Sequence, residues 1–363
     1  MTTLRIAQIV QHLAPGGIET MVLDLQKKAS APEQVHIISL EGTFEKASAH
    51  WPRIKNTPRL HFLKKPPGLS LKAVKQLADL LKQLNISVVH THHVGPLLYG
   101  GLAAKLAGCQ HVHTEHDAWH LANPKRRLLV GACFHLLRPR VAADAKLVAQ
   151  NIRQHIPLFT PSVILNGIDT ELFCPGDQSQ ARELLALPKD KQIIGCAGRF
   201  TAVKSQHLLI EALAALPEAA HLALAGGGEL EQDLRHQVQQ ANLEDRVHFV
   251  GVVEHMPDFY RAIDLFCMTS QREGLPLSPL EAQACERAAL LTDVGGCLEA
   301  VDPESGLLVP YGDAQALQQA LNTLLQTGLT SEARASARQF VLKNGDLQRM
   351  IHQYEQLYQG STL

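Results

Sequence analysis

Residues 272–282 read R-E-G-L-P-L-S-P-L-E-A, and this stretch decides the fold. An acid, Glu273, is followed by glycine and proline, and an apolar-periodic run that contains Glu281 comes next. The pattern predicts a loop that turns into a helix, with Ser278 as N-cap, Pro279 as first helical residue and Glu281 completing a capping box. The beginning of such a helix offers unpaired backbone N–H groups and a partial positive charge, which together suit a phosphate.

Chain length and composition predict a globular protein of two domains. At 363 residues the chain exceeds the size at which one hydrophobic core keeps growing. Hydrophobic residues make up 45% and charged residues 19%, which is ordinary for a folded protein. The 34 Lys and Arg residues against 35 Asp and Glu residues leave a formal net charge of -1. Nucleic acid is therefore not an expected partner, because binding to phosphate backbones needs a basic surplus.

The cysteines and the N-terminus favour the cytoplasm. The seven cysteines are dispersed without a C-x-x-C pair, which is typical of reduced thiols in a cytosol. The chain enters a strand without a basic and apolar signal segment, so we expect no export.

The N-terminal half opens as a Rossmann-like strand, turn and helix. Leu4–Val10 is a short apolar run that predicts a buried parallel strand, and a helical pattern follows over Thr20–Lys28. The turn between them carries Gly16 and Gly17, which is short of the full dinucleotide fingerprint. A tight turn that needs positive φ explains either glycine equally well. Strand and helix patterns then alternate, as in a parallel sheet covered on both faces.

Two histidine clusters occupy residues 90–93 and 111–117. On a strand, His111, His113 and Glu115 would share one face, which is a plausible set of divalent-metal ligands. However, the carboxyl ends of parallel strands are where an open α/β sheet forms its ligand crevice, with or without a metal. We favour histidines that line this crevice or support the structure over a metal centre.

Residues 125–140, K-R-R-L-L-V-G-A-C-F-H-L-L-R-P-R, are basic at both ends and apolar between. The apolar core is too short to span a bilayer. It could lie on an anionic membrane surface. We favour a helix packed in the N-terminal domain with exposed basic ends, because the stretch shows no wide polar face.

A second run of strands and helices begins at Gln192. The strand Ile193–Ala197 is followed by Arg199 and Lys204, five residues apart. Such cations can meet a diphosphate from two sides, and a solvated basic turn is the alternative interpretation. Later apolar runs at 222–225, 247–250 and 265–268 predict strands, the last of which leads to Glu273.

The motif E-G-x-P-x-S-x-x-E-A, with V-G-G-x-x-E at 294–299 behind it, resembles the signature of retaining GT-B glycosyltransferases of the family 4 type. The resemblance covers nearly the whole chain. It implies an α/β GT-B architecture, in which two Rossmann-like domains with parallel sheets face each other across a cleft. Residues 1–167 would form the acceptor-binding domain, with a C-terminal helix at 344–363 packing back on it. Residues 168–343 would bind the nucleotide-sugar donor.

The same resemblance implies roles for individual residues. Glu273 would lie by the donor sugar hydroxyls, Glu281 would reach the ribose, and His116 would sit against the donor sugar. The implied catalytic residues are His116, Glu273, Arg199 and Lys204. The implied donor-binding residues are Gly16, Gly17, Asn166, Arg199, Lys204, Val253, Gly274, Leu275, Leu277, Ser278 and Glu281. The chain departs from the family at Glu286, where glycine is usual, and at Ala288, where proline is usual.

The implied activity is transfer of a hexosyl or N-acetylhexosaminyl group from a nucleoside-diphosphate sugar, with a UDP-sugar favoured, and with retention of anomeric configuration. The acceptor would be a saccharide or a lipid-linked acceptor in cell-surface polysaccharide or lipopolysaccharide biosynthesis. No cofactor is expected, since Arg199 and Lys204 would replace a metal at the leaving group. The alternatives are a nucleotide-sugar 2-epimerase and a non-catalytic nucleotide-sugar-binding protein. The expected location is cytoplasmic, with peripheral contact at the inner face of the membrane as an alternative.

Overall fold

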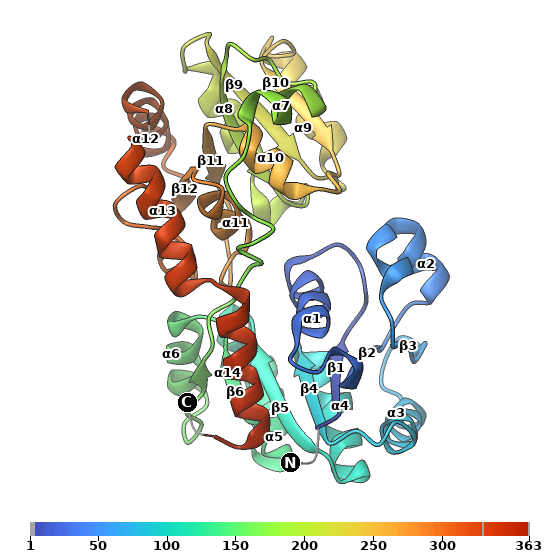
Figure 1. Ribbon diagram of the computed structural model, residues 1–363. Coiled ribbons are helices and arrows are strands. Elements are labelled where there is room, and N and C mark those ends of the chain that lie inside the picture. The colour runs from blue at the N-terminus through green and yellow to red at the C-terminus, as the bar shows by residue number, and fades with distance from the viewer. Residues whose placement is uncertain (1–3, 329, 362–363) are drawn as a thin grey trace. The chain divides into compact units, whose positions relative to one another are not determined.

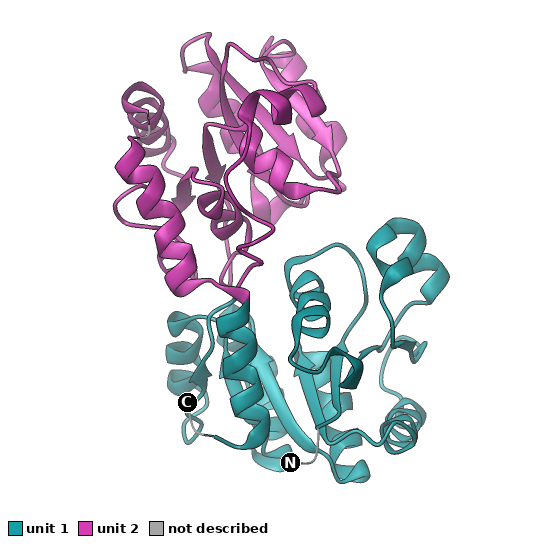
Figure 2. Cartoon of the chain, in the orientation of Figure 1, with its two compact units in different colours: residues 1–166, 348–363 teal, residues 167–347 magenta. Residues whose placement is uncertain are grey.

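The computed structural model describes residues 4–328 and 330–361. The predicted domain limits at residues 1 and 363 lie outside the described residues. The chain forms two compact units: unit 1 comprises residues 1–166 and 348–363, and unit 2 comprises residues 167–347 (Figure 2). The chain therefore returns to unit 1 at its end.

The two connecting segments pair with each other at Ile168. The Ile168 N–H donates to the carbonyl of Gly345 at 2.8 Å, and the Ile168 carbonyl accepts from the N–H of Leu347 at 3.0 Å. These bonds hold residues 345–347 with unit 2. The return to unit 1 consequently comes at residue 348, later than the predicted 344.

Unit 1 is built on a sheet of seven strands, and every strand pairing in it is parallel. The spatial order is β3-β2-β1-β4-β5-β6-β7. The strands are β1 (Ile6–Val10), β2 (Val35–Ser39), β3 (Leu60–Phe62), β4 (Val88–His92), β5 (Gln110–Glu115), β6 (Arg140–Ala143) and β7 (Ser162–Val163). The predicted parallel α/β fold is confirmed. β4 begins only at Val88, after the Ile86 N–H has bonded the carbonyl of Leu81 in the preceding helix.

The helices of unit 1 connect and cover these strands (Figure 1). They are α1 (Gly17–Lys28), α2 (Phe44–His50), α3 (Leu71–Gln83), α4 (Val94–Ala107), α5 (Pro124–Leu137), α6 (Lys146–His155) and α14 (Leu347–Gln359). Local sequence explains their starts. Ser70 caps α3 by accepting from the Ala73 N–H at 3.2 Å, and Asn123 caps α5 just before Pro124. The face of α3 with Val74, Leu77 and Leu81 is buried in the core.

The C-terminal helix α14 is tied to the sheet of unit 1 (Figure 1). The buried Tyr358 hydroxyl accepts from Gln8 Nε2 at 3.0 Å and lies 2.8 Å from His90 Nδ1. Tyr354 Oη lies 3.0 Å from Thr114 Oγ1. These contacts join α14 to β1, β4 and β5, so the last helix is part of the interior of unit 1.

Unit 2 contains a second parallel sheet, of six strands in the order β10-β9-β8-β11-β12-β13. The strands are β8 (Gln192–Ala197), β9 (Ala220–Ala225), β10 (Val247–Gly251), β11 (Leu265–Met268), β12 (Ala288–Thr292) and β13 (Leu307–Val309). The helices are α7 (Gln178–Leu184), α8 (His207–Ala214), α9 (Glu231–Gln240), α10 (Met256–Ala262), α11 (Ser278–Ala284), α12 (Ala314–Thr327) and α13 (Ser331–Asn344). Residues of α8, α9 and α12 pack with the strands in one apolar core.

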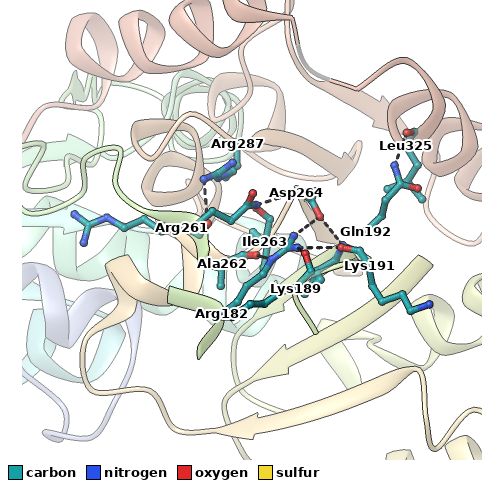
Figure 3. Close-up of polar contacts among 12 residues, drawn as sticks. Arg182, Lys189, Lys191, Gln192, Arg261, Ala262, Ile263, Asp264, Arg287 and Leu325 are labelled. Atoms are coloured by element: carbon teal, nitrogen blue, oxygen red, sulfur yellow. Dashed lines mark hydrogen bonds and ion pairs between the residues drawn. The ribbon is translucent and has the colours of Figure 1, made fainter. Parts of the chain in front are cut away.

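A buried arginine fixes the amino ends of β8 and β11 (Figure 3). Arg182 Nη2 donates to Asp264 Oδ2 at 2.7 Å, and its other nitrogens donate to the carbonyls of Ala262, Lys189 and Lys191. The same Asp264 oxygen accepts from the Ile193 N–H at 2.7 Å. These contacts hold the segments that lead into β8 and β11 together.

The predicted capping box at the start of α11 is wrong. The helix begins at Ser278 with Leu277 as its N-cap residue, and no side-chain cap bond forms. The Glu281 carboxylate instead accepts from the Tyr260 hydroxyl at 2.5 Å. Tyr260 is fully buried, so its hydroxyl requires a hydrogen-bond partner, and Glu281 supplies it.

The departure from the family at Glu286 falls on a strained turn. α11 ends at Ala284, and Glu286 then turns the chain with a φ of 62°. This left-handed conformation favours glycine, which is the residue that the family usually has there. Ala288 is the first residue of β12 and is buried beside Leu265.

We expect Glu286→Gly to stabilise the protein. Relief of a left-handed backbone is worth about 1–2 kcal/mol, and the added freedom of glycine in the unfolded chain offsets about 0.4–1 kcal/mol of it. Urea unfolding should show a higher midpoint with an unchanged slope. Glu286→Ala is the matched control, because it keeps the Cβ and the strain. A glycine variant that is less stable than the alanine variant would contradict this account.

Candidate active site

The strand order of unit 2 defines where its loops diverge. β8 lies between β9 and β11, so the connection after β8 runs to one side of the sheet and the connection after β11 runs to the other. Open α/β sheets bind ligands outside the carboxyl ends of the strands at such a switch point. The loop after β8 carries Arg199 and Lys204, and the loop after β11 carries Glu273. The topology therefore brings three predicted site residues to one edge.

Lys204 and Glu273 form an ion pair at this switch point. Lys204 Nζ donates to Glu273 Oε1 at 2.6 Å, and the side chains are 26% and 11% exposed. The pair joins residues that are 69 positions apart in the sequence. A cation and a carboxylate thus stand side by side, partly shielded from water, where a polar ligand can separate them.

The loop that carries Glu273 is fixed from behind by the V-G-G turn. Gly295 has a φ of 55°, and a Cβ on it would lie 1.8 Å from the Glu273 carbonyl oxygen. The Gly296 N–H donates to the carbonyl of Gly274 at 3.0 Å. The two motifs therefore belong together because their backbones touch, and only glycine allows that approach.

The Arg199 turn is held in a similar way. Gly226, at the end of β9, would place a Cβ 2.1 Å from the Gly198 carbonyl oxygen. The Arg199 carbonyl accepts from Gln206 Nε2 at 3.0 Å. The Arg199 side chain itself is exposed at the carboxyl edge. The backbone is thus positioned while the guanidinium reaches solvent.

The remaining predicted residues of unit 2 lie on the same strand-to-helix edge. Val253 follows β10, Gly274, Leu275 and Leu277 lie between β11 and α11, and Ser278 is the first residue of α11. Leu275 is buried, whereas the others are partly exposed. The predicted ribose role of Glu281 and the diphosphate contacts at 277–278 stay predictions.

The carboxyl edge of unit 1 carries a set of buried polar residues. His92 ends β4, His116 follows β5, and Asp144 follows β6. His116 Nε2 lies 3.0 Å from His92 Nδ1, and His116 Nδ1 lies 3.3 Å from Asp144 Oδ2. Asn166 Nδ2 donates to the same Asp144 oxygen at 3.0 Å. The structure therefore brings His116 and Asn166, both predicted site residues, to one carboxylate.

A hydrogen-bond chain fixes the proton on His92. Its Nε2 lies 2.9 Å from Gln8 Oε1, and an amide oxygen only accepts, so His92 carries its proton on Nε2. Burial, reinforced by His90 and other histidines, holds the pKa of His92 well below its ordinary value. A neutral His92 accepts on Nδ1, so His116 donates to it from Nε2. Both nitrogens of His116 are thus engaged, and a sugar hydroxyl that bonds His116 must displace one partner.

The metal-ligand alternative finds no matching geometry. His111 Nε2 and His113 Nδ1 both lie within 3.0 Å of Thr91 Oγ1, at 3.0 and 2.9 Å. Burial raises the pKa of Glu115 to about 8, so this acid is protonated near pH 7. In the described part of the chain, no group of three or more His, Cys, Asp or Glu side chains is arranged to hold a metal ion.

The G-G turn of unit 1 does not need positive φ. Gly16 is the N-cap residue of α1 with an extended φ of -171°, so the interpretation of a left-handed turn is wrong. A Cβ on Gly16 would lie 2.5 Å from a carboxylate oxygen of Glu19. Gly17 begins α1 and is exposed. Gly16 thus leaves room for the Glu19 side chain.

A cavity of about 260 Å³ lies at the opposite edge of the sheet of unit 2. Its lining includes Lys189, Gln192 and Ala288, at the amino ends of β8 and β12. Lys189 pairs with Glu183 at 2.8 Å. The neighbouring Arg182 donates to Asp264 and to three backbone carbonyls (Figure 3). Ligand sites of open α/β sheets lie at the carboxyl edge, so this cavity is not the candidate site.

Two parallel α/β sheets, each with polar and charged residues at the switch-point edge, define a protein of the GT-B glycosyltransferase architecture. Residues 15–172 match Glycosyltransferase Family 4, and residues 177–340 match Glycosyl transferases group 1. The chain belongs to this family of group 1, family 4 type glycosyltransferases.

Individual relatives agree with this assignment. The lipopolysaccharide core biosynthesis mannosyltransferase LpsB of Rhizobium meliloti is 38% identical over 44% of this chain and 49% of its own length. A D-inositol 3-phosphate glycosyltransferase of Xylanimonas cellulosilytica is 30% identical over 70% of this chain and 68% of its own length. The crystal structure of Anabaena HepE in complex with UDP superposes with a TM-score of 0.86 at 22% identity, covering 99% and 100% of the two chains. The last likeness shows the fold.

The sequence pattern does not predict several polar residues that the structure places at or behind these edges. Asp144 follows a strand directly, which is a signal that could have identified it. Tyr260 and Tyr358 lie in helices whose local pattern says nothing about their partners, and Tyr358 is 350 positions from Gln8. His93 was included only as one member of a histidine cluster.

Proposed function

We propose that the protein transfers a hexosyl or N-acetylhexosaminyl group from a nucleoside-diphosphate sugar, most favourably a UDP-sugar, with retention of configuration. The acceptor is a saccharide or a lipid-linked saccharide of cell-surface polysaccharide or lipopolysaccharide synthesis. Unit 2 binds the donor and unit 1 binds the acceptor. The observation that carries the proposal is the Lys204–Glu273 pair at the switch point of unit 2.

The charges of this pair match the two ends of a sugar diphosphate. When the bond from sugar C1 to the diphosphate oxygen breaks, negative charge develops on the leaving group, and Lys204 and Arg199 stabilise it. Glu273, released from Lys204, accepts hydrogen bonds from sugar hydroxyls. The new bond joins C1 to the acceptor oxygen, and the hydroxyl proton leaves with the diphosphate or solvent. The relatives support this chemistry, since Anabaena HepE was crystallised with UDP and with UDP-glucose.

A thermal-shift screen over UDP-, GDP-, ADP- and TDP-sugars tests the proposal and finds the donor. A ligand at a hundred times its dissociation constant adds about 2.7 kcal/mol of stability. Sugar release or transfer is then followed with the stabilising donor. Interconversion of the donor sugar without an acceptor would favour the 2-epimerase, and binding without turnover would favour the non-catalytic protein.

The two cations should each matter for turnover. We expect Lys204→Ala and Arg199→Ala to lower kcat/KM by roughly 100- to 1,000-fold, or about 2.7–4 kcal/mol, as for loss of one donor to a developing anion. Arg199→Lys should recover little if the contact is forked. The control is Lys189→Ala, which removes an exposed pair with Glu183 at the opposite edge of the sheet and should cost less than about fivefold. Losses below fivefold in both alanine variants would remove these cations from the site.

Turnover should not require a divalent metal. The positive charge that a metal would supply comes from Arg199 and Lys204 in this proposal. We expect transfer rates in EDTA to equal those without chelator. Activity that stops in EDTA and returns with manganese or zinc would contradict this prediction.

Peripheral membrane contact through α5 is a second proposal, and one specific observation favours it. The helix buries Val130, Cys133 and Phe134, as expected for a packed helix. It also leaves Leu128 75% and Leu136 70% exposed, in a helix whose first turns carry Lys125, Arg126 and Arg127. Exposed leucines beside basic residues suit an anionic lipid surface. In the described residues, no helix has the length and apolarity to cross a membrane.

Binding to vesicles tests this contact. The protein should sediment with phosphatidylglycerol vesicles and much less with phosphatidylcholine vesicles. Replacing Leu128 and Leu129 by Ser should weaken binding by about tenfold or more, given the apolar area removed. Leu184→Ser, on an exposed leucine of α7, is the control. Equal sedimentation of all three proteins would rule out α5 as the contact.

A further inference from the structure

His93 occupies an unusual backbone conformation at the carboxyl edge of unit 1. It is the single residue between β4, which ends at His92, and α4, which begins at Val94. Its φ is 72° and its ψ is 163°, a region that essentially only glycine occupies without strain. Such strain persists where the surrounding structure imposes it, and it concentrates at functional sites.

The packing of α4 imposes this conformation. A Cβ on Gly95 would lie 2.0 Å from Gln11 Oε1, and a Cβ on Gly100 would lie 2.5 Å from Thr91 Cγ2. The helix is therefore pressed against β4 and the loop after β1, which leaves room for a connection of one residue. Glycine would suit this position best, yet the sequence has histidine.

The imidazole of His93 does not serve the fold in an evident way. As the N-cap residue of α4 it forms no side-chain cap bond. Within residues 4–328 and 330–361 its ring makes no hydrogen bond, and it is partly exposed. By contrast, His90, His92 and His116 are hydrogen-bonded at both ring nitrogens.

The position of His93 is where unit 1 should bind a ligand. β1 lies between β2 and β4, so the connections after β1 and β4 diverge, and His93 lies at this switch point. Its ring centroid is 6.4 Å from that of His116. The titratable groups that act electrostatically on His93 are His116 and Asp117 after β5, His12 after β1, and His113 within β5.

The chemistry of the ring indicates the kind of ligand. Burial, with a smaller effect of His116, lowers the pKa of His93 to about 4, so the imidazole is neutral near pH 7. A neutral imidazole offers one donor and one acceptor. This pairing matches a hydroxyl group, which both donates and accepts, better than it matches a phosphate or a carboxylate.

We propose that His93 is a substrate-contacting residue that binds a sugar hydroxyl at the switch point of unit 1. The inference rests on the proposed glycosyl transfer and adds a residue to it. The strained backbone is retained because it holds the imidazole toward the substrate.

The test compares stability with activity in His93→Gly, His93→Ala and Leu158→Gly. Leu158 also has a positive φ, 79°, but lies between α6 and β7 at the opposite edge of the sheet. Both glycine variants should melt at or above the wild-type temperature, because each relieves a left-handed backbone. kcat/KM should fall by about tenfold or more in both His93 variants, as for one lost hydrogen bond, and stay within twofold in Leu158→Gly. Added imidazole should restore part of the activity of His93→Gly alone.

Transfer to two kinds of acceptor shows whether His93 binds a hydroxyl of the donor sugar or of the acceptor. Transfer from the stabilising nucleotide-sugar of the screen is measured to water and to a panel of methyl glycosides. Equal losses with both acceptors assign the hydroxyl to the donor sugar, and a loss confined to the glycosides assigns it to the acceptor.

Activity within twofold of wild type in both His93 variants, or a lower melting temperature in His93→Gly, would overturn the inference while leaving glycosyl transfer intact. A His93→Gly variant that does not fold would overturn the inference in the same way as a lower melting temperature. Wild-type protein without turnover on any donor would instead refute the proposed function, and this inference with it.

Discussion

Parallel pairing of strands is the constraint on which the candidate site depends. In a parallel sheet every strand-to-helix loop emerges at the same edge, so residues far apart in the sequence become neighbours when their strands are adjacent. β8 and β11 pair directly, and the loops after them carry Lys204 and Glu273. An antiparallel β11 would send Glu273 to the amino edge, away from Lys204. The parallel pairing thus brings the cation and the carboxylate to the same edge.

Burial imposes a different requirement on unit 1. Its central strands carry histidines, and desolvation keeps the pKa of His90 and of His92 well below the ordinary value. A neutral imidazole still needs one donor and one acceptor partner, and an unpaired one would cost about 1–3 kcal/mol. Tyr358 of α14 is the hydrogen-bond partner of His90 Nδ1, and Tyr354 bonds Thr114, whose hydroxyl is the partner of His90 Nε2. The return of the chain to unit 1 as α14 is therefore part of how the histidine network is satisfied.

The sequence predicted what depends on local pattern and on topology. Strand and helix periodicity predicted the parallel sheets, whereas a common site for Arg199, Lys204 and Glu273 was implied by the family resemblance. The prediction from local pattern failed where a side chain bonds a residue distant in sequence instead of the neighbouring backbone. Glu281 has the spacing of a capping box, but the hydroxyl of the buried Tyr260 takes its carboxylate. Likewise the φ of His93 follows from how closely α4 approaches β4, and a local sequence pattern does not specify that distance.

Glu286 and His93 both have a positive φ, and their positions in the sheet topology show which of the two strained residues lies where a ligand binds. Glu286 lies between α11 and β12, at the helix-to-strand edge, where the sheet has no ligand crevice. His93 lies between β4 and α4, at the strand-to-helix edge and at the switch point. The same kind of backbone strain therefore has different consequences at the two positions. At residue 286 glycine would only relieve the strain, whereas at residue 93 glycine would also remove an imidazole from the edge at which the substrate binds. Strain alone does not indicate function, but strain at the carboxyl edge that carries an unpartnered polar side chain does.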